Sequence, residues 1–272
     1  MQVIPVTDVS RGFGSTSRRD AWWVAPLAVF LGLGTFLIYS TWAAFQNAHY
    51  TFGPYLSPFY APVLWASPDN PAGLEHAWFG AKPDWFPALL PFSPALLILP
   101  FPGLFRFTCY YYRGAYYKAF WADPPSCAVG EPRKSYWGEQ SFPLILQNVH
   151  RYFLYIACIF LFLLSYDVWL ATRWPDGAGG TTFGIGVGTL LLAVNVVMLS
   201  SYTLGCHAMR HIVGGFYDEV SKHPVCDGAY ACSSALNYKH QLFAWISLFT
   251  VGLSDLYVRL CSMGIWTDYR IL

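Results

Sequence analysis

The sequence predicts an all-α integral membrane protein, a bundle of about five transmembrane helices whose N-terminus is cytoplasmic. Of its 272 residues, 55% are hydrophobic and only 11% are charged, whereas roughly a quarter of the residues in an ordinary soluble domain are charged. Several apolar stretches also approach the ~20 residues that a helix needs to cross a bilayer. We therefore expect one transmembrane helical domain over residues 1–272.

Five spans are expected along the chain. Three are nearly uninterrupted apolar runs, one contains small polar residues, and the second is broken by Pro91, Pro94, Pro100 and Pro102. Because proline removes a backbone donor and kinks a helix, the second span is expected to be bent. The spans cover residues 22–45, 86–107, 142–171, 182–213 and 240–261.

The connecting segments differ in composition. Residues 46–85 carry Gly53-Pro54 and Ser57-Pro58, which exclude a continuous helix, and are expected to form an extracytoplasmic loop. A short turn at Gly179-Gly180 joins the third and fourth spans as an antiparallel pair. Residues 108–141 and 214–239 are expected to be cytoplasmic segments.

The distribution of basic residues predicts the orientation. Twelve of the 16 Lys and Arg residues fall in the N-terminal tail, in residues 106–151 and in residues 210–240. The other four lie on the opposite side of the predicted membrane. Because cytoplasmic loops carry the excess of Lys and Arg, the N-terminus and both cysteine-bearing segments are assigned to the cytoplasm.

The segment Gly205-Cys206-His207-Ala208-Met209-Arg210-His211 is the strongest candidate for chemistry. His207 and His211 are four residues apart, so they share one face of a helix about 6 Å apart along its axis. Ionisable groups at membrane depth are costly and usually bind something or pair with one another. Two imidazoles beside a thiol therefore indicate a bound metal or haem, although hydrogen bonds to neighbouring helices would also explain them.

Further candidates fall on the same predicted membrane face. His150 opens the third span, His240 opens the fifth, and Cys109 and Cys127 lie in the preceding cytoplasmic segment. Imidazole and thiolate both suit iron. Two cysteines with two histidines would make a Rieske-type [2Fe-2S] cluster, whereas two histidines would bind haem b. The spacing does not choose between them.

Three other candidates stay outside this ligand pool. The second cytoplasmic segment carries two cysteines six residues apart, with a histidine just before them, which could imitate a zinc site. Solvent-exposed loop residues are the favoured interpretation. They are Cys226, Cys232 and His223.

A quinone site is expected from polar residues within the spans. Asp255 and Tyr257 lie in the fifth span, and Asp167 and Trp169 lie in the outer half of the third. A carboxylate and a phenol beside aromatic rings can hydrogen-bond a quinone carbonyl and pass protons. Arg151, at the start of the third span, completes the candidate set. Interhelical hydrogen bonds and an interfacial aromatic belt are the alternative.

Several segments together resemble the membrane anchor, cytochrome b or C-type, subunit of actinobacterial-type succinate dehydrogenase, the respiratory complex II. They include Cys-Tyr-Tyr-Tyr-Arg-Gly-Ala-Tyr-Tyr at 109–117, Phe-Pro-Leu-Ile-Leu-Gln-Asn-Val-His-Arg-Tyr at 142–152 and Asp-Leu-Tyr-Val-Arg-Leu at 255–260. The others are residues 39–47 and 205–211. The resemblance extends from the first span to the last.

The resemblance implies a multi-pass subunit of the bacterial plasma membrane within a succinate:quinone oxidoreductase. It would anchor flavoprotein and iron–sulfur subunits, which oxidise succinate, and pass the electrons to menaquinone or ubiquinone. Partners would also include membrane lipids, but no nucleic acid. The positions available for a Rieske-type cluster or haem b are Cys109, Cys127, Cys206, His150, His207, His211 and His240. The cluster is favoured because a haem held by two histidines would need no thiols.

The basic cytoplasmic surface would favour docking of an acidic face of the soluble partners or of anionic lipids. It includes Arg106, Arg113, Arg133 and Lys134. Two other classes remain open: a transporter or channel that uses the histidines as a proton or ion site, and a purely structural anchor without a cofactor. The absence of a visible internal repeat and the scarcity of intramembrane acids disfavour the transporter.

Overall fold

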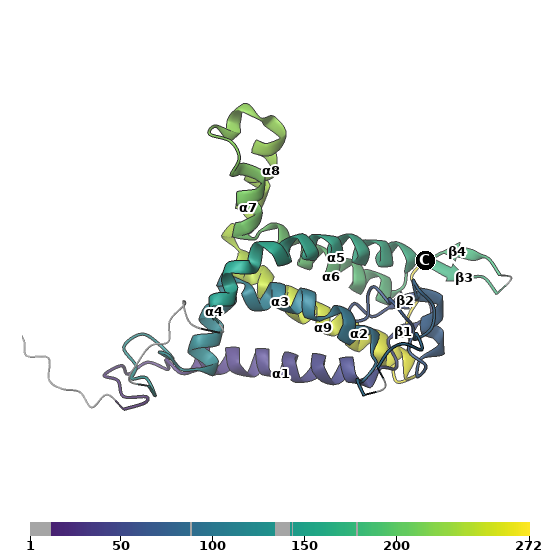
Figure 1. Cartoon of the computed structure of the whole chain (residues 1–272), viewed down its shortest axis with the longest axis horizontal. Helices are drawn as coiled ribbons and strands as arrows, with labels where there is room; N and C mark the ends of the chain where they lie inside the picture. The colour runs from purple at the N-terminus through teal and green to yellow at the C-terminus, as the bar shows by residue number, and fades with distance from the viewer. Residues whose placement is uncertain (1–11, 88, 134–141, 143, 178) are drawn as a thin grey trace, which may run out of the picture. The chain divides into compact units, whose positions relative to one another are not determined.

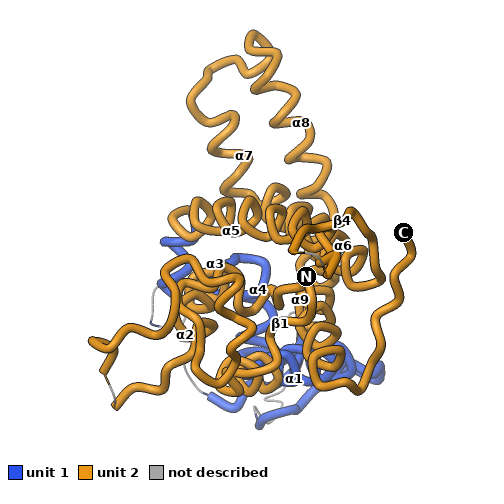
Figure 2. Tube along the Cα trace, turned by 90° about the vertical axis from the view of Figure 1, so that its right-hand side faces the viewer, with its two compact units in different colours: residues 1–37, 106–150 blue, residues 38–105, 151–272 orange. Residues whose placement is uncertain are grey.

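A computed structural model describes residues 12–87, 89–133, 142, 144–177 and 179–272. The chain divides into two units, residues 1–37 with 106–150 and residues 38–105 with 151–272 (Figure 2). Within the described ranges, four helices are long and apolar enough to cross a membrane: Val24–Gln46, Ile145–Leu170, Val187–Leu204 and His240–Ser262. The predicted class, an all-α membrane protein, is confirmed.

The helices carry the labels of Figure 1. They are α1 (Val24–Gln46), α2 (Pro94–Ile98), α3 (Pro100–Thr108), α4 (Tyr110–Ala115), α5 (His150–Leu170), α6 (Val187–Leu204), α7 (His207–Gly214), α8 (Pro224–Tyr238) and α9 (His240–Ser262). Shorter turns of helix are η1 (Pro71–His76), η2 (Tyr116–Phe120), η3 (Leu144–Val149) and η4 (Val220–Lys222).

Two small antiparallel hairpins complete the described structure. Strands β1 (Thr51–Phe52) and β2 (Tyr55–Leu56) pair Thr51 with Leu56. Gly53 turns between them with a φ of +51°, which glycine adopts without steric cost. Strands β3 (Arg173–Pro175) and β4 (Thr181–Phe183) pair across the turn that joins α5 to α6.

The predicted second span, 86–107, is not one helix. Pro94 is the first residue of α2 and Pro100 is the first residue of α3. Proline is favoured at the first helical position, where its missing donor has no partner to lose, and is unfavourable farther in. The prolines that were expected to kink one helix therefore start two short ones.

The predicted fourth span, 182–213, is also divided. Helix α6 ends at Leu204, and α7 starts at His207 after Gly205 and Cys206. A Cβ atom at Gly205 would lie 2.9 Å from Cβ of Leu236 in α8, so glycine permits this close approach. Residues 214–239, predicted as a loop, are mainly η4 and α8.

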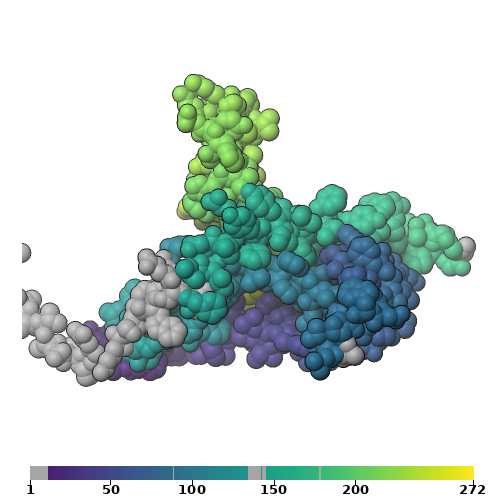
Figure 3. Space-filling model, in the orientation of Figure 1, coloured from purple at the N-terminus to yellow at the C-terminus, as the bar shows by residue number. Residues whose placement is uncertain are grey.

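The unit formed by residues 38–105 and 151–272 is built on the packing of α6 against α9. Its apolar cluster joins Tyr55, Ala171, Leu192 and Val258. Helices α7 and α8 pair with each other and project from the end of α6 (Figure 1). Figure 3 shows this α7–α8 hairpin standing out from the rest of its unit.

The other unit, residues 1–37 and 106–150, joins the start of the chain to the segment after η2. Gly14 N donates to Gly130 O at 3.0 Å, and Gly130 N donates to Ser15 O at 2.8 Å. In the same unit, the rings of Phe30 and Phe120 lie 5.1 Å apart between centroids. The ring contact holds the first half of α1 to η2, and the hydrogen bonds hold the segment before α1 to the segment after η2.

Candidate functional site: two cysteine–histidine pairs

In the first unit, Cys109 and His150 are brought together. Cys109 precedes α4 with extended backbone, and its side chain is 2% exposed. His150 is the first residue of α5. Its Nδ1 lies 2.9 Å from Oγ1 of Thr108, the residue just before Cys109. A hydrogen bond to one ring nitrogen is the device that orients metal-ligating histidines.

The second unit repeats this arrangement with Cys206 and His240. Cys206 precedes α7 with extended backbone and is 3% exposed. His240 is the first residue of α9, is 7% exposed, and stacks on Tyr202 of α6 with ring centroids 5.0 Å apart. Asn237 Nδ2 donates to Gly205 O at 2.8 Å, so the end of α8, just before α9, is tied to the residue before Cys206.

Both pairs share one local design. Each cysteine lies at the N-cap of a short helix, and each histidine begins a long apolar helix. An anionic ligand is favoured at an N-cap, because the free N–H groups of the first turn point toward it. Thiolate sulfur and imidazole nitrogen are the donors that iron centres use, and both thiols and the His240 ring are buried, whereas His150 is half-buried.

The other predicted metal ligands lie in different surroundings. Cys127 is exposed. His207 and His211 are exposed on α7 and hydrogen-bond each other, with their Nε2 atoms 3.0 Å apart. Partial burial and the neighbouring His211 and Arg210 lower the pKa of His207. These two imidazoles therefore hydrogen-bond each other instead of facing a buried thiol.

In the part of the chain that the structure describes, no group of three or more His, Cys, Asp or Glu side chains forms a metal-binding cluster. Each unit supplies a pair of donors. Each pair supplies one thiol and one imidazole, the two donor types that Rieske-type centres use.

The structure separates the predicted quinone-binding residues. Arg151 is the second residue of α5 and Trp169 is the last but one, so they lie about 27 Å apart along the helix axis. Asp255 is fully buried and paired with Arg259, and Tyr257 donates to Asp268 Oδ1 at 2.6 Å. The four residues do not converge on one site.

Sequence reasoning missed two features. Thr108 orients His150, but a lone threonine at the end of a helix carries no local signal. Glu75 and His76 of η1 line a pocket with Asp167; a histidine within a Pro- and Gly-rich loop shows no periodicity that would reveal this.

A family model described as actinobacterial succinate dehydrogenase subunit SdhC matches residues 24–264. The chain belongs to this family. It is therefore the SdhC-type membrane subunit of an actinobacterial succinate dehydrogenase, as the resemblance predicted. No curated protein matched this SdhC-family chain.

A solved structure supports the assignment over the whole chain. The "Mycobacterium smegmatis Sdh1 complex in the apo form" contains a chain that is 42% identical, with a TM-score of 0.83. The match covers 100% of this SdhC-family chain and 96% of the other. With four apolar helices of spanning length, the subunit is a membrane protein, and the family assignment favours the respiratory interpretation over a transporter.

Proposed function

We propose that this SdhC subunit relays electrons from succinate oxidation to a quinone, menaquinone or ubiquinone, through a Rieske-type [2Fe-2S] centre. We expect its ligands among Cys109, His150, Cys206 and His240, which the predicted topology assigns to one membrane face. When bound, such a cluster accepts and donates single electrons at a potential that its histidines raise. The observation that carries the proposal is that each unit holds a buried cysteine and a histidine that begins a long apolar helix.

The sequence supports a common membrane face for these ligands. The positive-inside distribution assigns the start of the third span, the end of the fourth and the start of the fifth to the cytoplasmic side. Two of the ligands, His150 and His240, begin spanning helices, so their positions follow the membrane boundary. The chain's own contribution is to orient the donors, through Thr108 at His150 and Tyr202 at His240, and to exclude water from both thiols.

The flavoprotein and iron–sulfur subunits would dock on the same cytoplasmic face. Arg106 donates to Tyr112 Oη at 2.9 Å, and Arg113 lies over the Tyr110 ring at 4.1 Å. Both guanidinium groups are thus held in place, which lowers the entropy lost when they pair with an acidic partner. Arg133 lies 3.8 Å from Asp123, and Lys134 falls outside the described residues.

The decisive experiment compares cysteine variants of the purified complex. Cys109→Ser and Cys206→Ser should each remove about two iron atoms per complex and abolish one electron paramagnetic resonance signal. The matched controls Cys127→Ser and Cys232→Ser, at exposed positions, should keep both. Succinate-dependent quinone reduction should fall at least tenfold in the first two variants, while reduction of a water-soluble dye by the soluble subunits continues.

Two results would overturn this proposal. A haem absorption spectrum that survives both cysteine substitutions but disappears in His150→Ala or His240→Ala would replace the cluster with haem b. Iron and haem absent from the membrane portion of the wild-type complex would leave only the structural anchor.

A further inference from the structure

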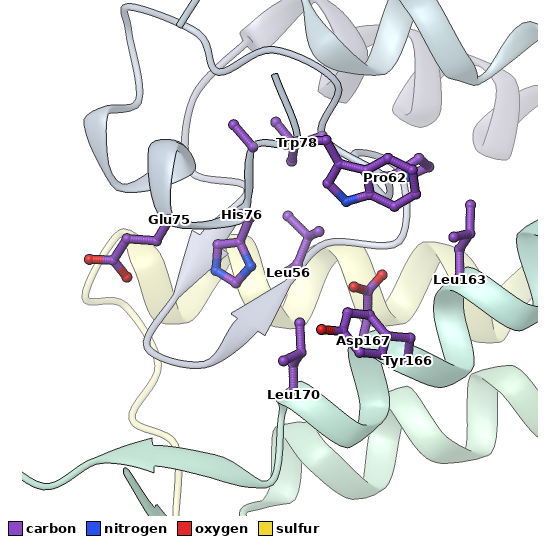
Figure 4. A pocket seen from close by; sticks show the side chains of 11 residues that line it. Leu56, Pro62, Glu75, His76, Trp78, Leu163, Tyr166, Asp167 and Leu170 are labelled. Atoms are coloured by element: carbon purple, nitrogen blue, oxygen red, sulfur yellow. The ribbon is translucent and has the colours of Figure 1, made fainter. Parts of the chain in front are cut away.

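A pocket of about 170 Å³ lies within the unit of residues 38–105 and 151–272 (Figure 4). One wall is the last two turns of α5, and the other walls come from β2, η1 and the loop around them. The lining includes four titratable side chains, Glu75, His76, Tyr166 and Asp167. None of the four belongs to the proposed iron ligands, and only Asp167 is considered from the sequence for a quinone site.

The titratable groups form a gradient from solvent to interior. Glu75 is exposed and His76 is half-buried. Among the described residues, Asp167 Oδ2 is buried without a hydrogen-bond partner. Figure 4 shows Asp167 and Tyr166 projecting from α5, and His76 and Glu75 projecting from the loop side. A charged carboxylate oxygen in that position would be costly, because no donor side chain of the described residues compensates it. The protonated carboxyl avoids this cost.

We propose that this pocket is a proton-exchange site, in which Asp167 holds a proton and His76 and Glu75 connect it to the solvent. The Asp167 carboxyl releases its proton through water to the His76 imidazole, leaving a carboxylate and an imidazolium. The imidazolium then passes the proton to the Glu75 carboxylate or to bulk water. One proton moves, and no electron or co-reactant is required.

His76 has the properties of a relay. Burial lowers its pKa below the ordinary value of 6.5, so the ring is neutral at neutral pH. A neutral imidazole carries one donor and one acceptor nitrogen and therefore accepts a proton on one side and gives one on the other. The pocket has room for several water molecules, since one needs only about 10–15 Å³ of such volume.

The volume and the position of the pocket favour proton exchange over the binding of a larger ligand. Pockets for drug-sized ligands are usually about 300–1,000 Å³, larger than this one. Asp167 also lies 17 residues along α5 from His150, which corresponds to about 25 Å along the axis. A quinone head group in the pocket would be nearly a full helix away from the proposed electron donor, whereas proton exchange needs no nearby redox centre.

Infrared difference spectroscopy of the intact complex in lipid nanodiscs tests the inference without turnover, so the state of the iron centre does not affect it. The wild-type complex should show a protonated carboxyl C=O band at neutral pH that shifts in D₂O. Asp167→Asn should remove this band, and Asp167→Glu should move it. The control Asp84→Asn, an exposed carboxylate outside the pocket, should leave it unchanged.

The relay is tested by the exchange rate of the same band. His76→Gln should slow its shift on transfer to D₂O at least fivefold, and Glu75→Gln should slow it less, because Glu75 lies nearest to bulk solvent. A band that persists in Asp167→Asn, or an exchange rate unaffected by His76→Gln, would overturn the inference. Labelling of Trp78 or Asp167 by a photoreactive quinone would also overturn it, in favour of a quinone site.

Discussion

Two carboxylates on membrane-spanning helices of the same unit, Asp255 and Asp167, have opposite surroundings. Asp255 Oδ2 accepts from Tyr39 Oη at 2.5 Å, and its Oδ1 accepts from Ser57 Oγ at 2.5 Å. Arg259 adds two further donors at 3.3 Å. Asp167, in contrast, faces a pocket and leaves Oδ2 without a partner. From the sequence alone, both residues are interpreted as proton-passing groups near a quinone.

The difference identifies Asp255 as a structural carboxylate and supports the proposal that Asp167 exchanges protons. Asp255 and Arg259 are 0% and 1% exposed, respectively, and Arg259 also donates to Ala48 O at 2.8 Å. Their network joins α9 to the end of α1 and to the loop after β2. Because every acceptor position of this carboxylate is engaged, a ligand at Asp255 would have to displace an existing bond. A group with an unsatisfied buried oxygen is the better candidate for proton chemistry.

Removal of the cation from this network should produce the largest loss of stability. Arg259→Met leaves the Asp255 charge buried without its counterion, which should cost about 3–5 kcal/mol of unfolding free energy. Unfolding of the purified complex in mixed micelles measures the change. The control Arg173→Met, at an exposed guanidinium over Trp169, should cost at most about 1 kcal/mol.

A second variant pair tests whether this loss comes from the unpaired charge. Replacing both residues, with Asp255→Leu and Arg259→Met together, should recover part of the lost stability, since apolar replacements of a buried ion pair are often tolerated. A double variant as unstable as the sum of the single variants would show that packing, and not charge, dominates at this position.

Loss of one hydrogen bond to Asp255 should have a smaller effect. Ser57→Ala removes a donor to a buried charged group and should cost about 1.5–3 kcal/mol. Ser165→Ala is the matched control, because Ser165 is exposed and bonds only to Leu161 O of its own helix; its effect should stay within about 0.5 kcal/mol. Equal losses in the two variants would contradict a special role for the Asp255 network.

The exposed histidines of α7 give a third, spectroscopic comparison. His207→Gln and His211→Gln should retain the iron content and paramagnetic signal of the complex, because these rings hydrogen-bond each other and not the buried thiols. His240→Gln should lose the signal. Loss of iron in His211→Gln would return the exposed pair to the ligand set.

Local sequence patterns predicted the continuous helices well and the site only in part. The apolar runs that became α1, α5 and α9 are defined by composition; α9 starts at His240 as predicted, whereas α5 starts at His150, inside the predicted third span. The helical spacing of His207 and His211 was also present in the structure. That motif nevertheless drew attention to exposed residues, because helical spacing does not tell which face a helix buries.

The remaining features depend on contacts between distant residues. The break between α6 and α7 lies where Leu236 approaches Gly205. The ring of His240 stacks on that of Tyr202, which lies 38 positions earlier in the chain. The pocket joins η1 to α5 across about 90 residues of sequence. A single sequence shows which residues are present but not which of them come into contact. The fully hydrogen-bonded carboxylate of Asp255 and the incompletely hydrogen-bonded carboxylate of Asp167 could therefore not be distinguished.

The smallest expected change of stability is that of Asp167→Asn. The amide has nearly the same volume as the carboxyl, and no hydrogen bond to Oδ2 is lost, because that oxygen has no partner. The unfolding free energy should therefore stay within about 0.5 kcal/mol of wild type, although Asp255→Asn, which weakens the pairing with Arg259, should be clearly destabilising. The same mixed-micelle unfolding assay compares both variants. A loss above about 2 kcal/mol in Asp167→Asn would mean that the ionised Asp167 stabilises the fold, and its function would then be structural, like that of Asp255.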